Sequence, residues 1–453
     1  MKQQVRVASG HGFWGDLQSA PMDQVSSGPV DYLVMDFLAE VTMSIMQKQK
    51  RRNPHSGFAR DVVHIIEEIL PICLEKGIRI VTNAGGANPE GCRDAIFKCA
   101  RKMNLSGLRV ATVRGDDILD RVDGFAERGI TLNNMDTGEP VTGIGHKILS
   151  ANVYFGASPI VEALESGAQI VLTGRTTDTG LTLAPMMHEF GWRDDEWDKL
   201  AAGTIAGHIL ECGGQATGGN FSADWRSVPD LEHIGFPIAE AYPGGDIVIT
   251  KHDSMGGLVT EQTVKEQLLY EIGDPSTYIT PDCVADFTTI HLSEDDANRV
   301  RMSGVKGRPA TDSYKVSMSY HDGYTATGTL TYAWPDALEK ARAADRILRS
   351  RLSNMGLQFE EIRSEFLGLN SCHGPLAEIP EEMNEVVLRV GVRGNDHSSV
   401  ERFGKEIAPL ILTGPPGVTG FAGGRPKPAE VIAYWPALIP KSAVAPEVTV
   451  EEL

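Results

Sequence analysis

Strand-like and helix-like stretches alternate through the first half of this 453-residue chain. Apolar runs that suit buried strands lie at residues 5–9, 30–37, 78–82, 108–113 and 169–173. Helical patterns separate them, of which residues 58–76 form the clearest amphipathic helix. Buried strands that alternate with helices are typical of a parallel sheet with helices on both faces. We therefore predict an α/β domain with glycine-rich ligand loops over residues 1–225.

The pattern changes after Asp224. Strand patterns lie at residues 246–251, 283–292, 314–320, 325–334 and 385–392, with helices at 335–355 and 398–407. This β-β-α then β-α order predicts a smaller α+β domain of the split βαβ kind over residues 226–411. Residues 412–453 form a closing segment rich in Gly and Pro, with the aromatic run Tyr434-Trp435-Pro436. We expect this segment to pack on the body or on a partner.

The charge and the apolar runs exclude several classes of protein. A net charge of -19 opposes binding to nucleic-acid phosphates and to anionic lipid. No apolar run approaches the ~18 residues of a membrane span, and the amino terminus lacks the apolar centre of a signal peptide. Six cysteines without a C-x-x-C pair fit reduced thiols. We expect a cytoplasmic protein that binds neither nucleic acid nor membrane.

Four loops carry the polar and glycine-rich sequence expected of a ligand site. They span residues 10–16, 83–89, 174–178 and 211–220. Each follows a predicted strand or short helix. Because the carboxyl ends of parallel strands lie along one edge of a sheet, we predict that the four loops converge on one pocket.

Two of these loops contain Gly-Gly pairs, which suggests backbone that takes positive φ or lies close against something. The functional interpretation is a cradle of backbone N–H groups, reinforced in 83–89 by a helix that begins at Pro89. The alternative is a tight crossover in which glycine only permits close packing. The candidate ligand-binding residues are Asn83, Gly85, Gly86, Asn88, Gly213, Gly214, Gln215 and Asn220.

Arg175 follows a predicted strand and is placed to bind a carboxylate or phosphate through both ends of its guanidinium. Asp178 would hold it in position or cap the next helix. The alternative is that Arg175 and Asp178 form a structural ion pair.

Acid–base and metal chemistry have several candidates. Glu211, His188 and Asp36 are candidate general acids or bases. Asp16, Asp36 and Glu40, with His188 or His208, are weak metal candidates, because no pair has the spacing of a known zinc motif. The bland alternative is that Asp16, Asp36 and Glu40 stand at helix starts. No cofactor is firmly implied, and a divalent metal is left open. Gly10-x-Gly12-x-x-Gly15 spells a dinucleotide pattern, but Asp16 directly after it opposes a pyrophosphate.

Several long stretches together resemble the acyclic terpene utilisation family of the AtuA type. They are GFWGD (12–16), VDYLVMDFLAEVTM (30–43), TNAGGANP (82–89), ILSANVYFGASPIVEALESGA (148–168), VLTGRTTDTGLTLAPMMHEFGW (171–192), AGHILECGGQATGGNF (206–221) and GRPKPAEVIAYWPALIP (424–440). The resemblance implies an enzyme that breaks down a small carboxylic acid or acyl-CoA. Longer relatives carry a further ferredoxin-fold domain at the carboxyl end, which implies a separate small ferredoxin-fold partner here.

Three functional hypotheses compete. The first is a lyase or hydratase, with Arg175 as anion clamp, an oxyanion donor set from Asn83, Asn88, Gln215 and Asn220, and Glu211 as acid or base. The second is covalent acyl transfer or hydrolysis by Cys212, against the alternative of an inert buried thiol. The third is a non-enzymatic acyl-CoA or carboxylate-binding protein or accessory subunit. We also expect a homo-oligomer whose contact includes residues 412–440, because Trp435 and its neighbours need cover.

Overall fold

The structure is a computed structural model that describes residues 2–421 and 423–453. The chain forms two compact units. The large unit runs to Ser319 and includes Tyr434–Leu453, and the small unit is Tyr320–Ala433. The predicted boundaries at 225/226 and 411/412 are therefore corrected. Strands at residues 238–250 and 291–303 join the ten-stranded sheet of the large unit, and strand patterns alone do not reveal which sheet a strand will pair with.

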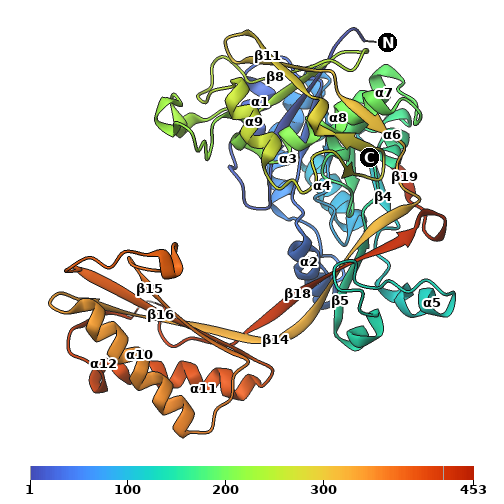
Figure 1. Cartoon of the computed structure of the whole chain (residues 1–453). Coiled ribbons are helices and arrows are strands. Elements are labelled where there is room, and N and C mark those ends of the chain that lie inside the picture. Colours follow the sequence, from blue (N-terminus) through green and yellow to red (C-terminus); the bar gives the residue numbers. More distant parts are fainter. Residues whose placement is uncertain (1, 422) are drawn as a thin grey trace. The chain divides into compact units, whose positions relative to one another are not determined.

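A sheet forms the centre of the large unit, with β8 and β11 toward one side and β4 and β19 toward the other (Figure 1). It has ten strands in the order β11-β12-β8-β7-β1-β2-β3-β6-β4-β19. Its parallel strands are β1 (Val5–His11), β2 (Tyr32–Met35), β3 (Arg79–Thr82), β6 (Ile170–Thr173) and β4 (Arg109–Arg114). Antiparallel strands extend it on both sides: β7 (Ile238–Ala241), β8 (Ile247–Thr250), β12 (Arg299–Ser303) and β11 (His291–Asp296) beyond β1, and β19 (Glu447–Glu452) on β4.

Helices cover both faces of this sheet, as the alternating pattern predicted. In β2, Leu33 and Met35 join one core cluster, and Tyr32 and Val34 join the other, because successive side chains of a strand point to opposite faces. The first cluster packs against α1 (Ala20–Ser26), α2 (Glu40–Arg52), α3 (Asp61–Lys76) and α4 (Pro89–Lys102). The second packs against α6 (Ser158–Glu165), α7 (Gly180–Phe190) and α8 (Trp197–Leu210).

Smaller elements complete the large unit. A three-stranded sheet pairs β13 (Lys306–Arg308), β10 (Val284–Asp286) and β9 (Tyr278–Ile279). It lies against α8, where the backbone N–H of Gly307 donates to the Asp198 carboxylate over 2.9 Å. The remaining helices and strand are α5 (Val122–Glu127), β5 (Ile148–Val153) and α9 (Glu261–Leu269).

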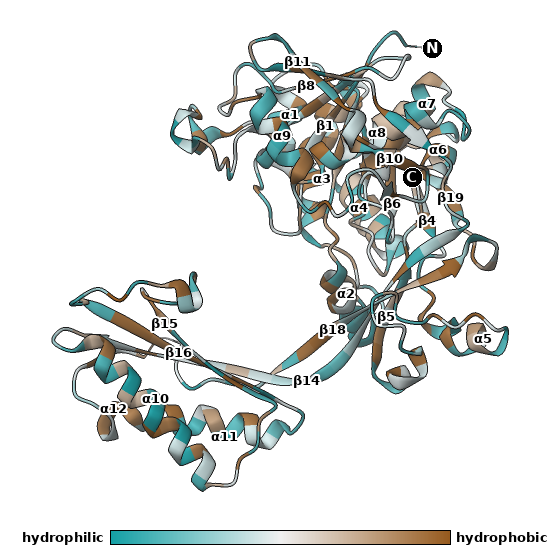
Figure 2. Cartoon of the chain, in the orientation of Figure 1, coloured by the Kyte–Doolittle hydropathy of each residue, from teal (hydrophilic) through white to brown (hydrophobic). Residues whose placement is uncertain are grey.

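The small unit has the split βαβ arrangement that the sequence predicted. Its elements are β14 (Ser313–Ala333), α10 (Ala337–Asn354), β15 (Glu361–Leu367), β16 (Glu385–Gly394), α11 (His397–Ile407), α12 (Leu410–Thr413) and β17 (Val418–Gly420). The strand order β15-β16-β14-β17 places β16 between the two strands that α10 connects. Figure 2 shows hydrophobic and hydrophilic residues in turn along α10, whose buried face includes Ala344 and Leu348.

Two sequence expectations change in this region. The strands predicted at 314–320 and 325–334 are one continuous strand, β14, whose residues up to Ser319 belong to the large unit. The aromatic run lies in β18 (Ala429–Pro440), and Trp435 is buried within the large unit, donating from Nε1 to the Leu132 carbonyl over 3.1 Å. The chain itself therefore covers Trp435, and the argument for a second subunit over this side chain no longer holds.

Candidate functional site

The carboxyl ends of the five parallel strands bring three of the predicted loops to one edge of the sheet. The backbone N–H of Asp36, after β2, donates to the His11 carbonyl over 2.9 Å. Asn83, after β3, donates from its side chain to the Asp36 carboxyl over 2.6 Å. Arg175, after β6, donates to the Leu38 carbonyl over 3.0 Å. These contacts link loops 10–16, 83–89 and 174–178 in one network.

The fourth loop, 211–220, reaches the same edge through a close approach at Gly12. A Cβ added to Gly12 would lie 2.7 Å from the Glu211 carbonyl oxygen, which is closer than a side chain can approach. Gly85 is constrained in the same way, because its Cβ would lie 2.6 Å from the Thr173 carbonyl oxygen. At these two positions glycine permits loops to pack closely, which is the crossover alternative rather than the cradle.

A cavity of about 480 Å³ opens beside this edge, entirely within the large unit. Its charged lining residues are Glu40, Asp178, His208, Glu211, Glu271 and Lys315. Hydroxyl groups come from Tyr154, Thr177, Tyr278, Thr280, Thr311 and Ser313. Apolar surface comes from Met135, Ile279, Pro281 and Leu438. Loops 174–178 and 211–220 therefore contribute to the cavity, whereas no residue of 10–16 or 83–89 lines it.

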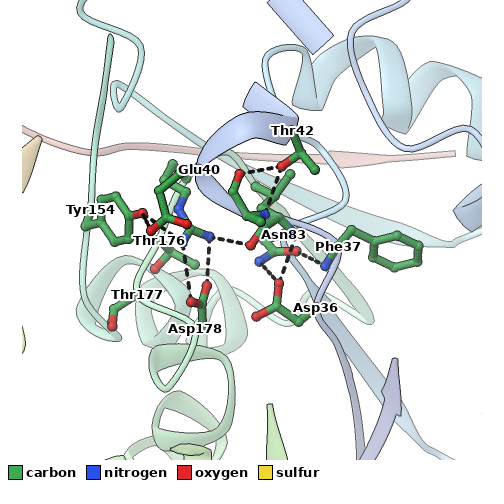
Figure 3. Close-up of polar contacts among 12 residues, drawn as sticks. Asp36, Phe37, Glu40, Thr42, Asn83, Tyr154, Thr176, Thr177 and Asp178 are labelled. Carbon is green, nitrogen blue, oxygen red and sulfur yellow. Dashed lines mark hydrogen bonds and ion pairs between the residues drawn. The ribbon is translucent and has the colours of Figure 1, made fainter. Parts of the chain in front are cut away.

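Arg175 lies beneath the cavity wall with only 1% of its side chain exposed. Two nitrogens of its guanidinium donate to the two oxygens of Asp178, over 2.7 and 3.3 Å, and one of them donates to the Tyr154 hydroxyl over 3.0 Å. The Tyr154 hydroxyl in turn donates to Glu40 over 2.9 Å (Figure 3). The structure therefore shows the ion-pair alternative. Arg175 is buried under the carboxylates that face the cavity, and it fixes their positions.

The pKa of the Glu40 carboxyl, in this same network, is lowered. Burial alone would raise the pKa of its carboxyl, but the charge of Arg175 and hydrogen bonds from backbone N–H and the Tyr154 hydroxyl outweigh it and lower the pKa. Glu40 begins α2, as the helix-start alternative predicted, and it also lines the cavity. Both interpretations of this residue therefore apply.

His208 and Glu211 form a second pair on the cavity wall, at the end of α8. His208 Nδ1 lies 2.8 Å from a Glu211 carboxyl oxygen. His208 Nε2 lies 3.1 Å from the Gln267 carbonyl, which can only accept, so Nε2 carries a hydrogen. The contact between Nδ1 and Glu211 must then hold one proton, which resides on either the ring or the carboxyl.

The pKa values of this pair are shifted in the same direction. Burial raises the pKa of Glu211, against the opposing effect of His208. Burial would lower the pKa of His208, but its hydrogen bond to Glu211 and the charge of that carboxylate outweigh burial, and the pKa is raised. A carboxylic acid whose pKa is raised in a cavity is the usual form of a general acid.

Two buried carboxyls lie behind the cavity without lining it. Burial raises the pKa of Asp36 well above its usual range, with the charge of Asp178 adding to the effect. Burial likewise raises the pKa of Asp116 to about 7. One Asp116 oxygen accepts from the Arg175 backbone N–H over 2.8 Å and from the Asn152 side chain over 2.9 Å. Asp116 thus holds the loop that carries Arg175.

The other candidate residues occupy structural positions. Asn88 caps α4 by accepting from the Gly91 N–H over 3.1 Å. Asp16 accepts from the Gly12 N–H over 2.8 Å within its own loop. His188 lies 3.1 Å from Arg79, the first residue of β3, which places it at the opposite edge of the sheet from the cavity. None of these three side chains lines the cavity.

The Gly-Gly turn after α8 is packed against the protein. Gly213 has a φ of 56°, and its Cβ would lie 2.7 Å from the Phe236 ring. Residues 213–217 form a 3-10 helix, and Asn220 is exposed. Gly86, Gly214 and Gln215 do not line the cavity either. The roles predicted for these residues remain predictions that the cavity does not support.

Neither the Cys212 thiol nor the metal candidates show the features that their predicted roles require. Burial raises the pKa of the Cys212 thiol to about 12, so the thiol is protonated at neutral pH. Within residues 2–421 and 423–453, no three His, Cys, Asp or Glu side chains are grouped to hold a metal ion. Asp16, Asp36 and Glu40 therefore form no shared ligand set.

Sequence reasoning missed Asp116, Tyr154, Glu271, Tyr278 and Lys315, and it treated His208 only as a metal candidate. Asp116 follows β4, so the rule that predicted Asp36 and Arg175 could have found it. Three of the others lie outside the parallel strands: Tyr154 directly follows β5, Tyr278 lies in β9, and Lys315 lies in β14. No local pattern marks them.

Comparison with known proteins now gives the family. The model of the acyclic terpene utilisation family protein AtuA matches residues 5–450. This chain belongs to the AtuA family. No curated protein and no solved structure matches it. None of the helices that the structure describes is long and apolar enough to cross a membrane.

Proposed function

We propose that this AtuA-family protein is an acid–base enzyme of the lyase or hydratase type that acts on a small carboxylic acid or its acyl-CoA thioester. The observation that carries the proposal is the His208–Glu211 pair on the wall of a cavity of about 480 Å³. A cavity of this volume suits a small acid or the acyl part of a thioester.

Adding or removing water requires one group to donate a proton and another to accept one. Glu211 is the general acid, because burial raises the pKa of its carboxyl and so favours the protonated form. Asp178 is the base that orients or deprotonates water. Its carboxylate lies on the same cavity, is 32% exposed, and is held by Arg175 from behind.

Hydroxyl groups supply the donors that the reaction needs for developing negative charge. Burial raises the pKa of Tyr278, so its hydroxyl keeps its proton and can donate a hydrogen bond. Thr177 and Thr280 line the same cavity. These residues take the part that the amides of Asn83, Asn88, Gln215 and Asn220 were predicted to play.

The two alternatives make different demands. Acyl transfer or hydrolysis by Cys212 needs a thiolate, and a thiol pKa of about 12 does not support one. A binding protein or accessory subunit needs the cavity but no proton transfer. The experiment that separates it from the enzyme must therefore measure turnover and binding independently.

The test uses a panel of short unsaturated and hydroxy acids, each as free acid and as CoA thioester, with mass spectrometry to detect the gain or loss of one water. For the substrate found, Glu211→Gln should lower kcat by about 10²- to 10⁴-fold and leave binding almost unchanged. Glu401→Gln, at an exposed position on α11, is the matched control and should keep full activity.

Binding of panel members without any turnover would identify a binding protein. Turnover that survives Glu211→Gln would remove Glu211 from the mechanism. Turnover that instead disappears in Cys212→Ser would favour the covalent alternative.

A further inference from the structure

The cavity contains a single lysine or arginine among the described residues that line it, and this is Lys315. The nearby Arg175 cannot serve a ligand in the same way. Its guanidinium is buried, and its terminal nitrogens are committed to Asp178, Tyr154 and the Leu38 carbonyl. A ligand would have to break these contacts to reach it.

Lys315 is held in place without being neutralised by a close partner. Its ammonium lies 5.1 Å from the centre of the Tyr154 ring and 5.6 Å from that of Tyr434, so two aromatic rings flank it. Its ion pair with Glu40 is long, at 4.0 Å, and its side chain is 42% exposed. It donates no hydrogen bond to any residue that the structure describes, which leaves the ammonium hydrogens available.

The other charges of the cavity determine where an anion can lie. The other titratable acidic and basic side chains of the lining are four carboxyls, Glu40, Asp178, Glu211 and Glu271, together with His208. His208 is already paired with Glu211 at 2.8 Å. A ligand carboxylate is therefore repelled from most of the wall and attracted only near Lys315.

We infer that Lys315 is the substrate-anchoring residue, which binds the carboxylate of a small acid and thereby directs the rest of the molecule toward Glu211. The inference rests on the proposed function where it names Glu211 as the reacting group. The binding of a carboxylate by Lys315 can be tested without any reaction. Ile279, Pro281 and Leu438 supply apolar surface for the carbon chain. The substrate class is then a monocarboxylic acid with a short apolar chain.

The test compares hexanoate with hexanamide, which has the same shape and no charge, by isothermal titration. The wild-type protein should bind hexanoate more tightly. Lys315→Met should weaken hexanoate by about tenfold or more and leave hexanamide unchanged, because only the charged hydrogen bond is lost. Lys315→Arg should retain the preference. Lys306→Met, whose side chain is 65% exposed and pairs with Asp198 outside the cavity, is the matched control.

The anchor is wrong if the wild-type protein does not prefer hexanoate, or if Lys315→Met keeps that preference. Its failure can be told from failure of the proposed function. If the protein prefers hexanoate through Lys315 but shows no detectable water addition, the anchor is supported and the proposed reaction is not. If turnover needs Glu211 but Lys315→Met leaves KM and the hexanoate affinity unchanged, the proposed reaction is supported and the anchor is wrong.

Discussion

At the scale of single residues, Arg175 shows how burial changes a role. A guanidinium at a strand end is ready to bind an anion, but here its side chain is 1% exposed and pairs with Asp178 at both ends. A clamp and a buried ion pair predict different mutant properties. A clamp can be removed without loss of stability, whereas removal of one partner of a buried pair leaves the other charge uncompensated.

Arg175→Met should therefore lower the free energy of unfolding by about 3–5 kcal/mol, because Asp178 and Tyr154 lose their shared partner. Chemical denaturation monitored by circular dichroism measures this change. The double variant Arg175→Met/Asp178→Leu should recover part of the loss. If Arg175→Met is fully stable but no longer binds hexanoate, Arg175 is an anion clamp and not a structural ion pair.

Asp116 gives a second prediction at this scale, about pH. Its pKa is raised by burial to about 7 in the folded protein, against an ordinary value of 3.8. The folded state therefore holds this proton more tightly than the unfolded state does. The stability contribution of the protonated carboxyl is complete below about pH 4 and is lost as the pH rises to about 7.

Asp116→Asn should remove that contribution to the pH dependence. The difference in free energy of unfolding between wild type and variant should change by a few kcal/mol, on the order of the pKa shift, between pH 4 and pH 8. Urea unfolding at several pH values measures it. A constant difference over this range would show that Asp116 does not titrate there.

At the scale of elements, the glycine loops act by letting neighbouring segments approach. The turn after β3 passes the end of β6 so closely that a Cβ at Gly85 would lie 2.6 Å from the Thr173 carbonyl oxygen. Gly12 meets the backbone after α8 in the same way, at 2.7 Å from the Glu211 carbonyl oxygen. These close approaches bring together the loops that follow the parallel strands, near Glu211 and Arg175.

Gly85→Ala should destabilise the protein by about 1–3 kcal/mol, because the backbone of one loop must move. Gly124→Ala is the matched control. It lies inside α5 with open space around its Cβ position, and it should leave stability unchanged or raise it by about 0.5–1 kcal/mol. Thermal unfolding of both variants decides the matter. Equal stability would mean that the Gly85 loop has room to adjust.

At the scale of the whole molecule, the carboxyl-terminal segment returns to the large unit. Trp435 is 3% exposed, and Ala437 and Ile439 are fully buried. β19 then pairs with the edge strand β4. Trp435, the side chain that was expected to need a partner, is thus part of the core of the large unit. A homo-oligomer and a small ferredoxin-fold partner stay predictions, which the burial of Trp435 does not test.

Trp435→Ala should lower the free energy of unfolding by about 3–5 kcal/mol and leave the molar mass unchanged wherever the variant is folded. Calorimetry and light scattering at one protein concentration measure the two effects. Trp435→Phe keeps a large ring without the N–H that donates to Leu132, and it should lose less stability. If a variant remains stable but its molar mass in solution changes, Trp435 contributes to a contact between subunits.

The local pattern of the sequence was sufficient for the parallel strands and the helices between them. Apolar runs such as residues 30–37 are short and bounded by turn signals, which favours a strand over a helix. The topology of α/β sheets then predicts that Asp36, Asn83 and Arg175 lie on one edge, which the structure shows. The α+β class of the small unit was likewise readable, but its element order was not, because β14 was predicted as two strands and β15 was not predicted.

The tertiary structure alone decided which of these polar residues face the cavity. Burial depends on what packs over a side chain, and at Arg175 the cover comes from Tyr154 and the backbone of Leu38, both distant in sequence. Lys315 faces the cavity only because β14 pairs with β5. Strand propensity marks a segment as extended but does not name its partner, since pairing is set by contacts between residues far apart in the chain.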